Sequence, residues 1–333
     1  MDLKKLTIVI SCLFCQLFVF SQTQNDTIVY DIKTEYIEKF PNRITTRLFY
    51  VNTSNTIKVN DRNSNLYFNL TPNKQNRIGA SVSFRSLTIS YSFAPDFLAE
   101  NKDNENSKLF NLGLRNYFGR HWMQTLDIYQ EKGFYIENND VNFYLPRMKS
   151  LKIGGATSYI FNENFSFRAI VSQDEKQLKS AGSFIPNIVY YYTKLNLRSD
   201  NNGVDTVLHT FDMVFAPSYY YNFIPTKNLF ISAGVATGIG LNYSKNEDNN
   251  HIQEDETLTS LTTELNFRGS MTYDISSFYI GTHYNYLILN HNTDRSSYIN
   301  DNIPFFQIFA GYRFKAPKKL VKKADEINEK IKL

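Results

Sequence analysis

The sequence predicts an all-β protein, an antiparallel up-and-down β-barrel of about 12–14 strands that spans a membrane. Two patterns predict it: apolar and polar residues alternate along several segments, and tight turns contrast with longer polar connections. A third observation is the abundance of Phe (27) and Tyr (23), which suits aromatic girdles at the two membrane surfaces. Because successive side chains of a strand point to opposite faces, such alternation separates a lipid-facing from a lumen-facing side.

The first 21 residues are predicted to be a cleaved signal peptide. Lys4 and Lys5 form a positive start, and an apolar run of 15 residues, 6–20, follows. That run is shorter than the roughly 20 residues that a membrane-spanning helix needs. The alternative, a lipid attached at Cys12, is disfavoured because Cys12 lies inside the apolar run, which cleavage there would shorten.

Residues 22–42 are expected to form a periplasmic N-terminal segment, and residues 43–314 the barrel. Alternation is weak at 44–51 and 66–70 and clearer in the strands predicted at 78–84, 87–93, 110–115, 125–129, 165–171, 231–241, 261–274, 278–288 and 306–314. Tight turns are expected at 85–86, 119–121, 224–228 and 275–277. Long loops are expected at 94–107, 137–149, 195–207, 244–257 and 290–304. In such barrels the short turns face the periplasm.

The strand count between the long loops at 137–149 and 195–207 is inconsistent. Two loops on the same side of the membrane require an even number of strands between them, and the predicted number is odd, because only the strand at 165–171 lies there. One segment is therefore misassigned. The charged stretch 173–180 is the suspect, as a loop, the start of a strand or a segment folded into the lumen.

The candidate functional site is a cluster of charged residues expected in the lumen: Arg168, Glu175, Lys176, Lys179, Glu264, Arg268 and Asp274. Residues 173–183 combine charged with small side chains where the strand count fails. Because buried charges need partners, we expect this stretch to pair with Glu264, Arg268 and Asp274. A solvated loop of mixed charge is the alternative. The alternation also places Arg115, Asp127 and Glu131 inward.

The sequence contains no nucleophile elbow, zinc-binding helix, phosphate-binding loop or calcium loop. We therefore expect no enzyme, no catalytic residues, no cofactor and no metal site. A lipid hydrolase needs Ser and His on the lipid-facing wall, whereas His283 falls on a polar face. The net charge of +4 is too small to predict nucleic-acid binding.

Residues 315–333 are expected to form a basic amphipathic tail. Its apolar residues recur at helical spacing, beside four lysines: Leu320, Ala324, Ile327 and Ile331, with Lys318, Lys319, Lys322 and Lys323. We expect a short periplasmic helix.

Several segments carry a resemblance to a known family. The most specific is Lys179-Ser180-Ala181-Gly182-Ser183-Phe184; others are Lys39-Phe40-Pro41-Asn42, Tyr129-Gln130-Glu131-Lys132-Gly133-Phe134-Tyr135 and Gly311-Tyr312-Arg313-Phe314. Together they resemble the Bacteroidetes proteins grouped as domain of unknown function 4421. The resemblance implies an outer-membrane β-barrel and no particular activity.

We therefore expect a protein of the cell outer membrane of a Gram-negative bacterium, exported by its signal peptide. Its expected partners are outer-membrane lipid and, during biogenesis, the barrel-assembly machinery. Two functions stay open: a small-solute channel or transporter, and a non-conducting scaffold or surface-binding barrel. Single-channel conductance separates them.

Overall fold

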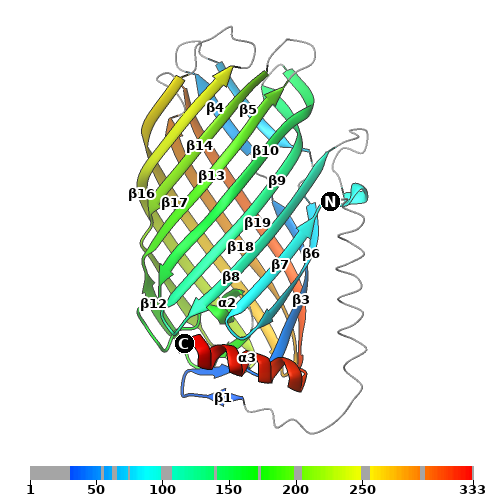
Figure 1. The fold of residues 1–333 in the computed structure, drawn as a ribbon, viewed down its shortest axis with the longest axis vertical. Helices are drawn as coiled ribbons and strands as arrows, with labels where there is room; N and C mark the ends of the chain where they lie inside the picture. The colour runs from blue at the N-terminus through cyan, green and yellow to red at the C-terminus, as the bar shows by residue number, and fades with distance from the viewer. Residues whose placement is uncertain are drawn as a thin grey trace.

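The computed structural model describes residues 31–53, 56–61, 66–73, 76–98, 107–138, 141–171, 174–198, 205–248, 256–292 and 297–331. The predicted signal peptide and Cys12 lie outside the described residues. Most of the described chain is strand, arranged as one tall barrel (Figure 1).

Twelve described strands close into an antiparallel ring, each paired with the next and the last with the first. In ring order they are β3 (Arg43–Thr53), β6 (Asn76–Phe84), β7 (Leu87–Phe93), β8 (Lys108–Phe118), β9 (Trp122–Asn138), β10 (Val141–Tyr159), β13 (Asn187–Arg198), β14 (Asp205–Phe215), β16 (Leu229–Asp248), β17 (Glu256–Ile275), β18 (Phe278–Asn292) and β19 (Ser297–Lys315). The predicted up-and-down barrel is confirmed.

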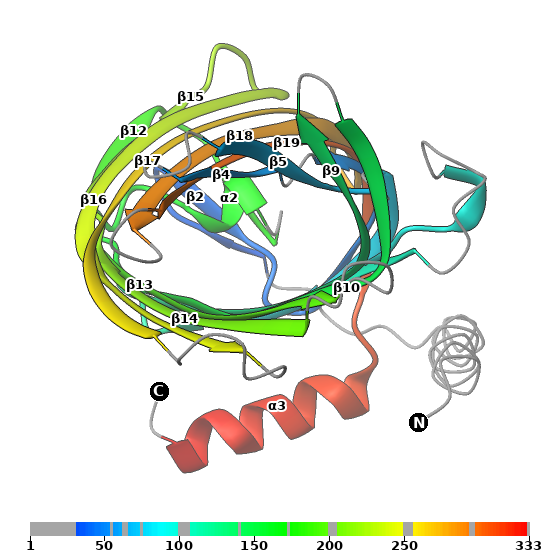
Figure 2. The ribbon, with the colours of Figure 1, turned by 90° about the horizontal axis from the view of Figure 1, so that it is seen from above.

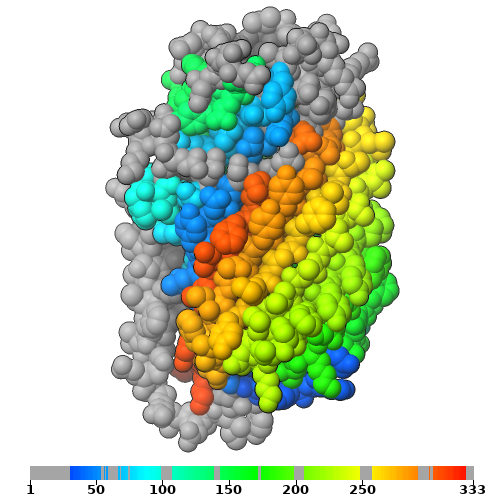
Figure 3. All heavy atoms as spheres, turned by 180° about the vertical axis from the view of Figure 1, so that it is seen from behind, coloured from blue at the N-terminus to red at the C-terminus, as the bar shows by residue number. Residues whose placement is uncertain are grey.

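The wall has its polarity reversed relative to a soluble protein. Large apolar side chains are exposed on its outside, with Leu48 at 67% and Leu261 at 65% exposed. Polar side chains are buried inside, including Arg47 and Glu264, both at 8%. Figure 3 shows β16 to β19 as tilted bands of one continuous outer wall. An apolar outside around a polar inside suits a barrel immersed in lipid.

The two ends of the barrel differ. One, the short-turn end, carries the turns at 85–86, 119–121, 224–228 and 275–277, as predicted. The other, the long-loop end, has shorter loops than expected, because strands such as β10 and β16 run well into the predicted loops at 137–149 and 244–257.

Four neighbouring strands, β3, β6, β7 and β8, have at most 11 residues, whereas β16 and β17 across the ring have 20 each. Above them the hairpin of β4 (Thr56–Asp61) and β5 (Leu66–Pro72) continues the wall, β4 pairing with β19 and β5 with β9. Strand β9 changes partner from β8 to β5 at Gly133, whose φ of +87° favours glycine. A Cβ there would also collide with the side chain of Ser107.

The strand predicted at 165–171 is wrong. Between β10 and β13 the chain forms the short helix α2 (Arg168–Val171), then β11 (Glu175–Gln177) and β12 (Ala181–Ile185). Figure 2 shows α2 inside the ring. The alternation of Phe165, Phe167 and Ala169 therefore marks a buried core and not a lipid-facing strand. We call residues 160–180 the plug.

This correction settles the strand count. Strands β10, β13 and β14 belong to the ring and were missed in whole or in part. Two of them, β10 and β13, are the ring strands between the long loops predicted at 137–149 and 195–207, so the number there is even. Strand β12 pairs with β15 (Ser218–Phe223), which extends the wall beside β16.

The first and last described segments lie near the short-turn end. Strands β1 (Ile32–Lys33) and β2 (Ile37–Lys39) form a small sheet with β11. The tail forms helix α3 (Lys318–Ile331), outside the ring in Figure 2, where Asp325 pairs with Arg85 of the β6–β7 turn. None of the described helices is long and apolar enough to cross a membrane.

Candidate functional site

The plug is fixed to the barrel wall by an apolar cluster. Phe165, Phe167 and Ile170 are at most 4% exposed, and Phe167 meets the wall residue Tyr220 edge to face at 5.3 Å. The cluster includes wall residues from four strands: Tyr117, Met123, Tyr220 and Phe230. Since these strands lie on different sides of the ring, the plug spans the lumen at the short-turn end.

Gln177 is the polar centre of the plug. Its Oε1 accepts hydrogen bonds from the Ser166 N–H (2.8 Å) and from Asn222 on the wall (3.1 Å). Its Nε2 donates to the carbonyls of Asn164 (2.7 Å) and Tyr36 (3.3 Å). One side chain, 2% exposed, therefore ties together the plug, the wall and the N-terminal segment.

The buried charges of the plug are paired. Arg168 lies 3.2 Å from Asp174 and 3.8 Å from Glu175, stacks over the Tyr117 ring and donates to the carbonyl of Arg85. Glu175 accepts a 2.7 Å hydrogen bond from the hydroxyl of Ser166. Burial, which outweighs the attraction of Arg168, raises the pKa of Asp174 to about 6.

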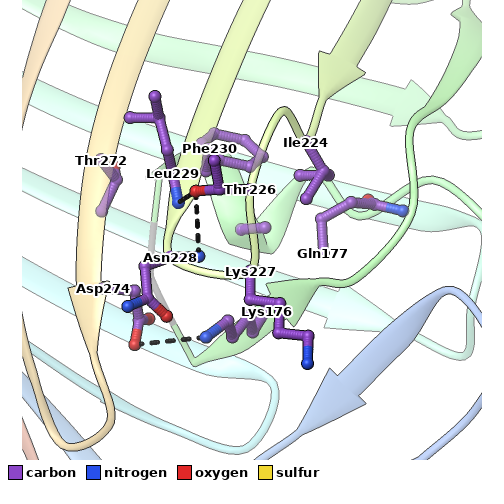
Figure 4. A pocket seen from close by; sticks show the side chains of 11 residues that line it. Lys176, Gln177, Ile224, Thr226, Lys227, Asn228, Leu229, Phe230, Thr272 and Asp274 are labelled. Carbon is purple, nitrogen blue, oxygen red and sulfur yellow. Dashed lines mark hydrogen bonds and ion pairs between the residues drawn. The ribbon is translucent and has the colours of Figure 1, made fainter.

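A second ionic group joins the plug to the wall. Lys176 of β11 lies 3.6 Å from Asp274 of β17, which also pairs with the buried Arg313 of β19 at 2.7 Å. Arg313 in turn stacks over Phe40 and Tyr279. Figure 4 shows Lys176 extending to Asp274 beside a pocket between the plug and the 224–228 turn.

The structure brings four of the seven predicted site residues together: Arg168, Glu175, Lys176 and Asp274 lie in these two ionic groups. Lys179 is exposed and pairs with Glu35 on the surface. Glu264 lies ten residues before Asp274, about 33 Å along β17, and therefore far from β11. Among the described residues, Arg268 contacts the plug at the Phe167 ring, 5.8 Å away.

Sequence reasoning missed several partners in these groups: Lys39, Ser166, Asn222 and Arg313. Asp174 and Gln177 lie in the predicted stretch 173–183, but they were not among the seven site residues. Asp174 adjoins the predicted Glu175, so the local charge density was a usable signal. Arg313 and Asn222 carry no such signal, because their importance comes from strands that meet the plug only in the fold.

The lumen above the plug holds arginines without an ion pair. Arg47 (β3), Arg77 (β6), Arg115 (β8) and Arg268 (β17), which we call the lumen arginines, have no carboxylate within salt-bridge distance among the described residues. Arg47 donates to Ser81 (3.2 Å) and Arg268 to Asn285 (3.4 Å). Buried nitrogens of Arg47, Arg77 and Arg115 have no acceptor. Within the described ranges, no cluster of three metal-ligating side chains occurs.

The fold and its lumen together define the class of protein: a membrane-spanning β-barrel of the outer-membrane type with an internal plug. Residues 25–314 match the family described as domain of unknown function (DUF4421), and the chain belongs to that family. The resemblance seen in the sequence is confirmed for the family. Comparison with curated proteins gave no match.

Solved structures with a similar fold are outer-membrane barrels. An outer membrane channel from Pseudomonas putida F1 is 9% identical, with 87% of this chain and 100% of that chain covered and a TM-score of 0.37. The toluene transporter TodX of P. putida is 8% identical, with 86% and 92% covered and a TM-score of 0.30. OprG of Pseudomonas aeruginosa is 10% identical, with 83% and 97% covered and a TM-score of 0.28.

Proposed function

We propose that the protein is an outer-membrane channel or transporter for small solutes, closed at rest by its plug. The short-turn end faces the periplasm in this proposal, as in other barrels of this kind. The plug then stands at the periplasmic mouth, and a solute entering from outside meets a polar lumen first.

The observation that carries the proposal is that the plug leaves and rejoins the wall at one place. The Phe161 N–H donates to the Phe184 carbonyl (3.3 Å), and the Asn162 side chain donates to the Gly182 carbonyl (2.7 Å). The residues between them are therefore an insert. Among the described residues, the backbone pairing of the twelve ring strands does not involve it, and its bonds to the wall include the hydrogen bonds of Asn222 on β15 and the Lys176–Asp274 ion pair. A hinged insert below a polar lumen is an arrangement suited to gating.

A non-conducting scaffold or surface-binding barrel is the second candidate. It is favoured by the apolar cluster around Phe165, Phe167 and Ile170, which holds the plug firmly in place. The two candidates differ in the conductance that they predict. A channel conducts once the plug is removed, whereas a scaffold needs no continuous lumen and stays non-conducting.

The test is planar-bilayer conductance of the intact protein and of a variant in which two glycines replace residues 163–181. Asn162 and Gly182 are adjacent, so the short linker can close the gap. We expect a low or intermittent conductance from the intact protein and a steady, larger one from the excised variant. Equal conductances of two correctly folded proteins would reject gating by the plug. Heat-modifiability on gels checks that both barrels are folded.

A further inference from the structure

The wall formed by β3, β6 and β8 presents hydrogen-bond donors without acceptors. Arg47 is 8% exposed and Arg77 is 4% exposed, yet the Nη1 of Arg47 and the Nε of Arg77 have no partner. The Nε of Arg115 is in the same state, and the Nε2 of His283 on the neighbouring part of the wall, β18, has no hydrogen-bond partner either. A buried donor that stays unpaired costs about 1–3 kcal/mol, and more when it is charged. Four side chains with unpartnered buried nitrogens in one lumen indicate a place where a ligand with hydrogen-bonding oxygens can bind.

Three of the lumen arginines face one region of the lumen. Arg47 stacks over the Phe309 ring at 5.1 Å, and the His283 ring lies 5.9 Å from the same ring. Arg268 donates to Asn285, which lies two residues from His283 on the same face of β18. The strand register places Arg115 in one row with Thr88, Ser83 and Thr45, and Thr45 lies two residues from Arg47 on the same face of β3. These side chains therefore surround a common space beside Phe309.

The charge in that space is positive. The carboxylates of Asp127 on β9 and of Glu264, four residues before Arg268 on β17, both act on Arg268, and neither forms an ion pair with these arginines among the described residues. Against three guanidinium groups this leaves one positive charge uncompensated. Arg115 and Arg268 are partly exposed, so solvent reaches the region from the lumen. The plug lies on the other side, since Phe167 lies under Arg268 at 5.8 Å.

We propose that Arg47, Arg115 and Arg268, with His283, form a binding site for a small oxyanion in the lumen above the plug. Guanidinium groups match the planar pairs of oxygens in phosphate and carboxylate groups, and rings of arginine line pores for anions. The inference rests on the proposed transport function in one respect: if the protein is a transporter, the site makes anionic solutes the class that it transports. The site itself does not depend on conduction.

The experiment measures binding of inorganic phosphate to the intact protein in detergent, by calorimetry at constant ionic strength in chloride. The Arg47→Gln/Arg115→Gln variant tests the site, and Arg120→Gln is the matched control, because Arg120 is an exposed arginine of the β8–β9 turn. We expect saturable binding by the wild type and the control. Loss of two charged donors should weaken binding by at least about tenfold.

Two results would overturn the proposal: no saturable binding of phosphate or citrate by the wild type, or binding that the double variant retains. Citrate serves as the carboxylate arm and distinguishes the two oxyanion classes. Should the double variant not fold, Arg115→Gln alone replaces it, since this side chain makes no hydrogen bond in the described structure. Binding without conductance by the excised barrel would refute the transport function and keep the site. Conductance by the excised barrel without binding would refute the oxyanion site and keep the transport function.

Discussion

The plug and the wall of β3, β6 and β8 both contain arginines with buried nitrogens. The arginine of the plug is paired with carboxylates, and those of the wall, in the part of the chain that the structure describes, are not. In the plug, Arg168 contacts Asp174, Glu175, an aromatic ring and a backbone carbonyl. On the wall, Arg115 has neither an ion pair nor a hydrogen bond among the described residues, and its Nε is buried without an acceptor. A paired charge holds structure together, whereas an unpaired one is available to a ligand.

The largest effect is expected from breaking the paired group. Arg168→Gln leaves Asp174 and Glu175 buried beside a neutral side chain, which should cost about 3–5 kcal/mol of unfolding free energy. Urea unfolding in lipid vesicles, followed by the fluorescence of the single tryptophan, Trp122, measures it. The exposed Arg120→Gln serves as control. Its ion pair with Glu163 is solvent-exposed, so the loss should stay below about 1 kcal/mol. Equal stability of the two variants would contradict the assignment of a structural role to the plug charges.

Gln177→Met should have the next largest effect. It keeps the volume and removes the acceptor of Ser166 and Asn222, which leaves buried donors unsatisfied at a cost of about 1–3 kcal/mol. Limited proteolysis gives a second readout, because a loosened plug is cut faster than the ring strands. A variant with wild-type stability and wild-type proteolysis would show that Gln177 does not hold the plug.

The pH dependence should be smaller and has a definite sign. The pKa of Asp174 in the folded protein is raised to about 6, so between its ordinary value of 3.8 and 6 the folded state holds a proton that the unfolded chain has released. The contribution of Asp174 to the free energy of unfolding therefore rises as the pH falls through 6. The wild type should gain stability relative to Asp174→Asn between about pH 7 and about pH 5. A difference that is constant, or that changes in the other direction, would be inconsistent with a buried Asp174.

The smallest effect is expected for Arg115→Gln without added oxyanion. Because Arg115 makes no bond that the substitution breaks, its unfolding free energy should stay within about 0.5 kcal/mol of wild type or increase. The same urea titration measures it beside Arg168→Gln. A loss as large as that of Arg168→Gln would mean that Arg115 is structurally paired after all.

Alternation predicted the membrane part of the wall well, because lipid on one side and polar side chains on the other impose a period of two. Segments such as 78–84, 87–93 and 261–274 were found for this reason. Toward the long-loop end the strands carry polar residues on both faces, as in β10 from Val141 to Ser150, so alternation disappears where the strand continues. Loops were therefore predicted too long.

The plug shows what alternation cannot separate. Phe165, Phe167 and Ala169 alternate as in a strand, but they are buried against the inside of the wall and not against lipid. The odd strand count indicated that one segment was misassigned, and the density of charge in 173–180 indicated that it lay close to these residues. The partners on other strands, Asn222 and Arg313, required the fold, because their contacts with the plug and its neighbours span long distances along the chain.

The most direct test of this account is the zero-current potential of the plug-excised barrel under a gradient of potassium chloride. Excision removes the paired charges of the plug and leaves the lumen arginines in place, so we predict a steady conductance with the sign of potential expected for chloride permeation. Adding Arg47→Gln and Arg115→Gln should move that potential toward zero. A barrel that stays closed after excision, or one that selects potassium, would contradict the account.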